Sequence, residues 1–498
     1  MVGVQRCCHG CRCVFSVFDS SEFCRAPLSE LPSTCKHSMD FAAVKCNPDP
    51  QIAATLASLG VNFDCASAGE LDMVTGLGVA ADRVVYAHPC KPPRQLSHAM
   101  EQGCTLTVAD GVEELEKIAA VAPDARVLLR IKVDDSASAM PFSAKFGADL
   151  TAVPFLMRRA AELGVRMVGV SYHVGSGCDH LNTYSQAVAA AAHVFKVGAD
   201  AGHSMTVLNM GGGYPGDAPA HGALHDMPAG FVDVAAQMNA ALAEHFPESR
   251  LDAATGQPMQ LMAEPGRYFV SACQTIATPV MAVRRNGDPA GDGMSRVYVD
   301  DGVYGSFNCI VFDHRAPMPT VLPQELLGSE CGTAEHILRT SPPMPLDGRA
   351  NNTGAADGSW ERVSVWGPTC DSLDRIVPEM YMKARPDGAA ALAVGDWLVW
   401  DAMGAYTNAA ASNFNGFQGP ARSYIPADAP WDFAEQLTQV QKEWLQRQAQ
   451  LQERYMHVDV SSGGGAPREG GVHSADQGQQ KRPAARAWLN ALASSEPG

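Results

Sequence analysis

The order of apolar and polar positions along the chain changes once, near residue 271. Before that point, short apolar runs alternate with stretches of helical length, namely 51–59, 113–121, 152–163, 184–199 and 231–243. Eight of the apolar runs are strand candidates, and they end at Lys45, Asp64, Ala87, Asp110, Arg130, His173, Asn209 and Glu264. Eight strands alternating with helices over roughly 230 residues are typical of a (β/α)8 TIM-like barrel. We therefore predict an α/β barrel domain over residues 38–271.

After residue 271 the strand candidates follow one another without helices between them. They cover 275–283, 296–299, 362–366, 397–400 and 421–425, and Gly and Pro separate them. This succession of strands without helices predicts a C-terminal antiparallel β-sandwich or β-barrel domain over 272–430, with a long exposed loop at 314–358. The divergent first segment, 1–37, contains one possible strand of the β domain, and 431–498 is predicted to be a helix followed by a disordered tail.

Charge and hydropathy narrow the classes of partner. The formal net charge is −17, which argues against nucleic acid and anionic membranes as partners. No apolar run approaches the roughly 18 residues that span a bilayer, and the N-terminal residues lack the apolar core of a signal peptide. We expect a soluble, cytoplasmic protein that acts on a small molecule.

The fifteen cysteines are odd in number and scattered through apparent core strands, which is typical of reduced thiols in a cytosolic chain. Cys7, Cys8, His9, Cys11 and Cys13 lie close together and are possible metal ligands. No second cluster follows at the spacing of a zinc finger, so no metal site is predicted.

Charged and polar side chains gather where the predicted barrel strands end. Lys45 ends an apolar run, although a lysine at such a place can also simply reach solvent. Asp64, Arg130, His173 and Glu264 end other strands. Because the carboxyl ends of barrel strands form one rim, where barrels carry out chemistry, these five side chains are candidates for a common site.

Two further features indicate the ligand of that site. Gly211, Gly212 and Gly213 follow the seventh strand, and such a run is either a tight turn or a cradle of N–H groups for a phosphate. Glu264 and Arg267 stand three residues apart, and they form either a mutual ion pair or two contacts to one ligand. A lysine, a phosphate cradle, an arginine and a lone carboxylate together predict pyridoxal 5′-phosphate as the cofactor. Ser176 is then expected to reach the phosphate, and His173 to stack on the pyridine ring or to be a core histidine.

Five motifs carry a resemblance to a known family. They are Ala-Val-Lys-Cys-Asn at 43–47, His-Val-Gly-Ser-Gly-Cys at 173–178, Ala-Glu-Pro-Gly-Arg-Tyr at 263–268, Asp-Asp-Gly-Val-Tyr-Gly-Ser-Phe-Asn at 300–308 and Trp-Gly-Pro-Thr-Cys-Asp at 366–371. Together they resemble the eukaryotic-type ornithine decarboxylases over about residues 15–417. The resemblance implies that Lys45 attaches the cofactor and that Glu264 faces the pyridine nitrogen. It also implies phosphate contacts from the three glycines, Arg267, Ser176 and Tyr406, and places Asp64, Arg130 and His173 around the ring.

The same resemblance implies a homodimer with shared active sites. By it, Cys370 protonates the carbon that loses carbon dioxide, whereas a lone cysteine is otherwise a small core residue. Asp313 and Asp371 are expected to bind the distal amine of the substrate, beside Tyr304 and Phe414. Two departures from the family pattern are Asn209, where an Asp is usual, and Phe312, where many relatives have Tyr.

The implied reaction is decarboxylation of L-ornithine to putrescine, a step of polyamine biosynthesis. Lysine remains open as a substrate because one methylene group is worth only about 1–3 kcal/mol of discrimination. Diaminopimelate is a further alternative, although Asp371 favours ornithine. A non-catalytic homologue that binds a regulatory protein is an alternative of a different class.

Overall fold

The computed structural model describes residues 15–19, 38–178, 180–216, 230–247, 259–285, 293–324, 360–385 and 390–425. The predicted barrel is confirmed, because eight strands close on themselves and every neighbouring pair is parallel. In chain order they are β2 (Ser38–Ala43), β3 (Asn62–Cys65), β4 (Val84–Tyr86), β5 (Leu106–Ala109), β6 (Arg126–Arg130), β8 (Arg166–Ser171), β10 (Val207–Asn209) and β11 (Gln260–Ala263).

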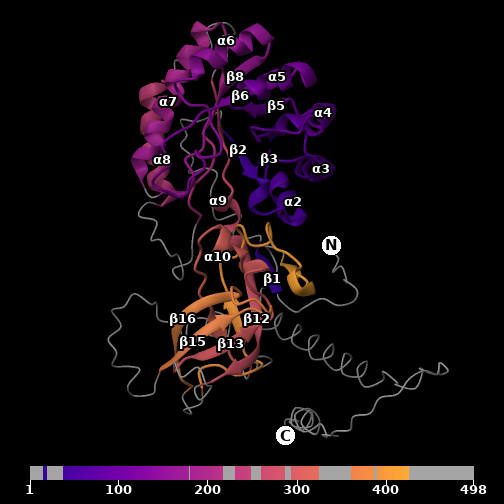
Figure 1. Ribbon diagram of the computed structural model, residues 1–498, viewed down its shortest axis with the longest axis vertical. Coiled ribbons are helices and arrows are strands. Elements are labelled where there is room, and N and C mark those ends of the chain that lie inside the picture. The colour runs from indigo at the N-terminus through magenta and orange to yellow at the C-terminus, as the bar shows by residue number, and fades with distance from the viewer. Residues whose placement is uncertain are drawn as a thin grey trace, which may run out of the picture. The chain divides into compact units, whose positions relative to one another are not determined.

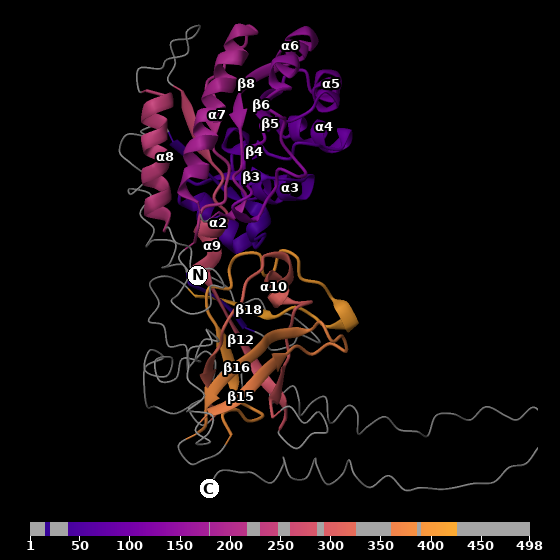
Figure 2. The ribbon, with the colours of Figure 1, turned by 60° about the vertical axis from the view of Figure 1, so that its left-hand side comes forward.

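Seven helices connect these strands and lie outside them (Figures 1 and 2). They are α2 (Pro50–Ser58), α3 (Ala68–Gly76), α4 (Pro93–Glu101), α5 (Val112–Val121), α6 (Val153–Leu163), α7 (Leu181–Asp200) and α8 (Phe231–His245). Local sequence sets where they begin: the side chain of Asp49, for example, accepts hydrogen bonds from the N–H groups of Gln51 and Ile52 at the start of α2.

The barrel strands are apolar on both faces, which explains why their sequences do not alternate. One buried cluster fills the inside of the barrel and a second and third pack between strands and helices. The inside cluster contains Phe41, Val85, Leu106, Val108, Leu128, Val168, Val207 and Met262, with one or two residues from each strand except β3. A core packed in this way leaves the polar chemistry to the strand ends.

The second part of the fold is an eight-stranded sheet, so the predicted β domain is present. Its strands are β1 (Phe15–Asp19), β12 (Gln274–Arg284), β13 (Ser295–Val299), β14 (Thr320–Leu322), β15 (Trp360–Trp366), β16 (Arg375–Lys383), β17 (Trp397–Trp400) and β18 (Ala421–Ile425). The prediction that it is antiparallel needs a correction, because β13 pairs with β15 and β1 pairs with β18 in parallel. The chain between β13 and β15 is long enough to return to the same end of the sheet before β15 begins, which is what a parallel pair requires.

Short elements account for the other differences from the predictions. A two-stranded ribbon of β7 (Ser138–Met140) and β9 (Ser176–Cys178) was not predicted, and β14 lies in the stretch expected to be a loop at 314–358. The remaining short elements are 3₁₀ turns and one-turn helices: η2 (Val44–Cys46), η3 (Ala81–Arg83), α9 (Arg267–Val270), η4 (Ser271–Cys273), η5 (Ser306–Asn308), α10 (Cys309–Phe312) and η7 (Phe414–Gly416).

The eight cysteines in the described part of the chain are free thiols, and most of them are buried. The predicted cluster from Cys7 to Cys13, most of the loop at 314–358 and the predicted tail at 431–498 lie outside the described residues. Within the described ranges, no helix combines the length and the apolar character needed to cross a membrane.

Candidate active site

Lys45 lies in the 3₁₀ turn η2 that follows β2, not on the strand itself as predicted. Residues that follow β17 hold this turn, because the N–H of Tyr406 donates to the Cys46 carbonyl at 2.9 Å and the Asn47 side chain donates to the Gly404 carbonyl at 2.7 Å. The position of the turn therefore depends on a segment more than 350 residues further along the chain.

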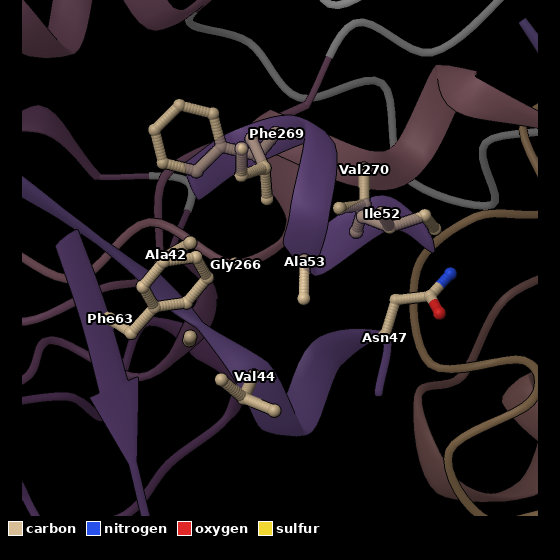
Figure 3. Close-up of a pocket in the computed structure, with 11 residues that line it drawn as sticks. Ala42, Val44, Asn47, Ile52, Ala53, Phe63, Gly266, Phe269 and Val270 are labelled. Carbon is tan, nitrogen blue, oxygen red and sulfur yellow. The ribbon is translucent and has the colours of Figure 1, made fainter. Parts of the chain in front are cut away.

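The apolar side of the Lys45 turn is closely packed. Val44, Ile52, Ala53, Phe63 and Val270 surround a cavity of about 10 Å³ there (Figure 3). A space of that size is at the lower limit for one water molecule. It is a packing gap, and Lys45 is not among the residues that line it.

The Lys45 amine pairs with Asp64, which is in β3. Lys45 Nζ lies 2.5 Å from Asp64 Oδ2, with the lysine side chain 41% exposed and the aspartate 1% exposed. Burial by itself lowers the pKa of Lys45, but the charges of Asp64, Tyr406 and Glu264 outweigh it and raise the pKa above its usual range. The buried Asp64 Oδ1 has no hydrogen-bond partner among the described residues. Asp64 thus holds the amine in place as an ammonium group.

Glu264 follows β11 and is 5% exposed. Its Oε1 accepts a hydrogen bond of 2.7 Å from Asn209 Nδ2, at the end of β10. Burial, followed by the negative charge of Asp64, raises the pKa of Glu264, whereas Lys45, Asn209 and Arg130 act in the opposite direction. The predicted alternative of a mutual ion pair between Glu264 and Arg267 is wrong, because each has a different partner.

The glycine turn after β10 is a place where only glycine fits. A Cβ atom at Gly211 would lie 2.0 Å from the Tyr172 carbonyl oxygen, and one at Gly213 would lie 2.1 Å from that of Gly175. Both glycines have positive φ, of 62° and 99°. Within the described residues, no protein acceptor lies at the N–H groups of Gly212 and Gly213. The turn presents N–H groups to whatever ligand lies next to it.

His173 lies two residues beyond β8, above the strand ends. Its Nδ1 accepts a hydrogen bond of 3.0 Å from the Gly175 N–H, and its ring packs edge-on against Phe142 at 4.8 Å. Burial lowers the pKa of His173 well below its usual value, and the charges of Arg130 and Lys45 lower it further. The imidazole is therefore neutral, with its proton on Nε2.

Two arginines border the same region. Arg267 donates to both oxygens of Asp313 at 2.6 Å, and its guanidinium lies 5.4 Å from the centroid of the Tyr406 ring. Tyr406 has a φ of 55°, a left-handed conformation that is rare for a bulky residue and is a sign of a functional turn. Burial lowers the pKa of Arg130, and the charges of Glu264, Asp110 and Asp64 partly offset this.

The remaining predicted residues form a second group in the β domain. The Tyr304 hydroxyl donates to Asp371 Oδ2 at 2.6 Å, and the Tyr304 ring stacks on Phe414 at 4.3 Å. The side chain of Cys370 is exposed, and its N–H donates to Asn415 Oδ1 at 3.0 Å. The N–H of Leu373 and the Tyr304 hydroxyl hold the pKa of Asp371 below its usual range, so this carboxylate is ionised. We call Tyr304, Cys370, Asp371 and Phe414 the Cys370 group.

The predicted site residues thus fall into two sets within one chain. One set is what we call the Lys45 group, and it consists of Lys45, Asp64, Arg130, His173, the three glycines, Glu264, Arg267, Tyr406 and Asp313. Among the described residues, no hydrogen bond, ion pair or ring contact joins the Cys370 group to it. Ser176 lies in β9, where its main-chain partner is Met140, and no described residue links its side chain to the Lys45 group.

Sequence reasoning did not identify Asn209, Asp374 or Asn415 as site residues. Asn209 was noticed only as a departure from a family pattern, yet it contacts both Glu264 and the glycine turn. Asp374 and Asn415 bind backbone groups of the loops that carry Tyr304 and Cys370. The contacts of these residues with Glu264, Val303 and Cys370 cross between segments far apart in the chain, and such contacts leave no spacing that a sequence could reveal.

The residues of the Lys45 group fit pyridoxal phosphate. The Lys45 amine is a group that can bond to the aldehyde of this cofactor. The buried Glu264 carboxyl is suited to a hydrogen bond with the pyridine nitrogen. The uncapped N–H groups of the glycine turn and the guanidinium of Arg267 are donors suited to a phosphate.

Comparison with known proteins agrees with this donor set. Residues 24–271 match the family described as "Pyridoxal-dependent decarboxylase, pyridoxal binding domain". Ornithine decarboxylase of Rattus norvegicus is 38% identical over 411 residues, which are 80% of this chain and 77% of the rat protein. Antizyme inhibitor 2 of Xenopus laevis is 39% identical over 398 residues, 78% of this chain and 76% of that protein.

Solved structures share the fold. The arginine decarboxylase of Paramecium bursaria Chlorella virus has a TM-score of 0.67 and 27% identity, and the match covers 83% of this chain and 96% of the viral chain. The barrel, the Lys45 group and these similarities lead to one conclusion: the chain belongs to the family of pyridoxal-dependent decarboxylases that includes the ornithine decarboxylases.

Proposed function

We propose that this chain is a pyridoxal phosphate-dependent decarboxylase that converts L-ornithine to putrescine and carbon dioxide. The observation that carries the proposal is the Lys45–Asp64 pair beside Glu264 and the glycine turn, in a chain 38% identical to rat ornithine decarboxylase. When bound, the cofactor would supply an electron sink for the electron pair left on the α-carbon as carbon dioxide departs.

The residues of the Lys45 group would hold and tune this cofactor. Lys45 would attach it, with its amine positioned by Asp64. Glu264 would keep the pyridine nitrogen protonated. Arg267 and the glycine turn would bind the phosphate, with further contacts from Tyr406 and, outside the Lys45 group, Ser176. The neutral ring of His173 would contact the pyridine ring, and Arg130 would offset the negative charge of Asp64 and Glu264.

The Cys370 group would serve the substrate. The Cys370 thiol gives a proton to the α-carbon that has lost carbon dioxide, so that carbon exchanges a carboxylate for a hydrogen atom. The ionised Asp371 would receive the distal ammonium group of ornithine, together with Asp313, whose carboxylate pairs with Arg267 in this structure. Tyr304 and Phe414 would form the wall beside it. A diamino acid needs carboxylates of this kind far from its α-carbon.

We also propose that the active site is shared across a homodimer. Support comes from the contacts of the described residues, since none of them joins the Cys370 group to the Lys45 group within one chain. Further support is the exposure of large apolar side chains around Cys370 and Asp313, which favours an interface. These side chains are Val311, Phe312, Leu373 and Phe414, of which Leu373 is 70% exposed.

Subunit mixing tests the shared site. Lys45→Ala and Cys370→Ala dimers should each be nearly inactive. Random exchange makes about half of the dimers hybrid, and each hybrid contains one site with both residues intact, so activity should recover to about a quarter of wild type. No recovery after demonstrated exchange would refute the shared site.

The reaction itself is tested by measuring carbon dioxide release from ornithine, lysine, arginine and diaminopimelate in parallel. We expect the highest kcat/KM with ornithine, and lysine as the nearest competitor. The similarity to an antizyme inhibitor makes a non-catalytic regulatory homologue the second candidate, with a regulatory protein as its partner. No decarboxylation of any of the four substrates by cofactor-loaded protein would favour that candidate.

The free thiols support our proposal that the protein works in the cytoplasm.

A further inference from the structure

The loops that carry the Cys370 group meet at one buried carboxylate, Asp374. It is 1% exposed, and it lies just before β16, three residues after Asp371. Its Oδ1 accepts a hydrogen bond of 2.8 Å from the N–H of Val303, next to Tyr304. Its Oδ2 accepts hydrogen bonds from the N–H and the hydroxyl of Thr369, next to Cys370, at 2.9 and 2.6 Å.

The main chain of Asp374 completes the contact with the Cys370 loop. Its carbonyl accepts from the N–H of Gly367 at 2.8 Å, and its own N–H donates to the carbonyl of Asp371 at 3.1 Å. The loop from residue 367 to 371 is therefore fixed at both ends and at Thr369. Cys370 itself is exposed, so its position depends on these anchors and on Asn415 rather than on side chains packed around it.

Glycine at two positions makes room for this carboxylate. A Cβ atom at Gly302 would lie 2.0 Å from Asp374 Oδ1, and one at Gly367 would lie 2.2 Å from the same oxygen. The two loops thus approach Asp374 more closely than any side chain would permit. A buried carboxylate held by three donors from two loops joins those loops at a fixed distance.

We propose that Asp374 is a positioning residue, which holds the Tyr304 loop and the Cys370 loop together so that the Cys370 thiol and the Asp371 carboxylate are presented to the substrate as one unit. The proposal rests on the proposed function in that it treats Cys370 and Asp371 as the residues that meet the substrate. Asp374 acts through those residues and touches no substrate itself.

The first test measures the loops directly. In Asp374→Asn, the amide replaces one acceptor oxygen with a donor, so amide hydrogen exchange should become at least about tenfold faster in peptides covering 300–306 and 367–373. The control is Asp396→Asn, since Asp396 is equally buried and accepts hydrogen bonds from the N–H groups of Gln324 and Ala393 and from the Arg385 guanidinium rather than from either loop. Unchanged exchange of both loops in Asp374→Asn would overturn the proposal.

The second test separates positioning from general stability. We expect Asp374→Asn to lower kcat by about 10²-fold at saturating cofactor, as a small misplacement of a reacting group can, and to raise KM, because Asp371 is displaced together with Cys370. In a Cys370→Ala background the same change should lower the residual kcat by less than about twofold, because the proton donor that it positions is already absent, whereas KM should still rise through Asp371. An equal loss in both backgrounds would show that Asp374 does not act through Cys370.

A milder variant covers the case in which Asp374→Asn does not fold. Thr369→Val removes one hydrogen bond to Asp374 and keeps the shape of the side chain, and we expect it to change exchange and kcat in the same direction but less. Wild-type exchange and kcat in that variant would overturn the proposal. If wild-type protein decarboxylates nothing, the proposed function fails, while the exchange experiment still decides whether Asp374 joins the two loops.

Discussion

Removal of the Asp64 charge should make the Lys45 amine more reactive in cofactor-free protein. The pair is separated by 2.5 Å, and Asp64 is fully buried. Opposite unit charges at that distance attract by about 7 kcal/mol at an effective dielectric constant of 20. Lys45 is 41% exposed, so water screens much of this attraction, and about 1.4 kcal/mol is a reasonable remainder. That energy equals about one pKa unit, so Asp64→Asn should make about tenfold more of the neutral amine available.

The assay is the rate at which an amine-selective reagent modifies Lys45 between pH 7 and 9, measured on the peptide that contains it. The reactive form is the unprotonated amine, so below the pKa of Lys45 the rate should rise with pH in both proteins. The rate should be about tenfold higher in Asp64→Asn at each pH, because Asp64 raises the pKa of Lys45. Lys145 in the same digest is the internal reference.

Asp110→Asn is the matched control for this experiment. Asp110 also follows a barrel strand, but its carboxylate accepts a hydrogen bond of 2.7 Å from the N–H of Gly147 rather than pairing with Lys45. Its loss should leave the Lys45 rate unchanged. Equal modification rates of Lys45 in wild type and Asp64→Asn across the pH range would refute the reasoning, since the ion pair would then not raise the pKa of Lys45.

Three further predictions follow from the same site. Lys45→Ala should abolish turnover and the borohydride-reducible attachment of the cofactor, and an adduct that survives on another lysine would contradict the assignment. Glu264→Gln should keep cofactor bound but lower kcat, because an uncharged partner no longer holds the pyridine nitrogen protonated, and wild-type kcat would contradict this. Gly213→Ala should destabilise the fold more than Gly202→Ala in urea unfolding. Both glycines have positive φ, which costs about 1–2 kcal/mol, but only a Cβ atom at Gly213 also collides with the Gly175 carbonyl. Equal decreases in the free energy of unfolding for Gly213→Ala and Gly202→Ala would show that the glycine turn accommodates a Cβ atom without strain.

The half of the site that lies in the barrel was predictable because of how parallel strands are arranged. Asp64 and Glu264 are 200 positions apart in the sequence, yet both lie where barrel strands end. All eight strands run in one direction around a closed barrel, so their carboxyl ends meet at one rim whatever their separation along the chain. Polar residues that follow apolar runs therefore identify that rim from the amino-acid sequence alone.

The partners of these residues could not be predicted in the same way. Sequence reasoning allowed an ion pair between Glu264 and Arg267, but in the folded chain Arg267 pairs with Asp313 and Glu264 with Asn209. Which carboxylate an arginine meets depends on side-chain packing across distant segments, and spacing along one segment does not contain that information. The parallel pairing of β13 with β15 was missed for a similar reason, because strand patterns carry no record of direction.

The sequence by itself thus determined the barrel, the existence of a β domain and the chemical type of the residues at the carboxyl ends of the barrel strands. These features follow from the order of apolar and polar residues along the chain, which decides which segments are buried as strands. Only the tertiary structure decided that Lys45 lies in a 3₁₀ turn, that Tyr304 pairs with Asp371, and that Asp374 joins two loops. These features depend on hydrogen bonds between remote segments. Such bonds form only after the core has brought those segments together.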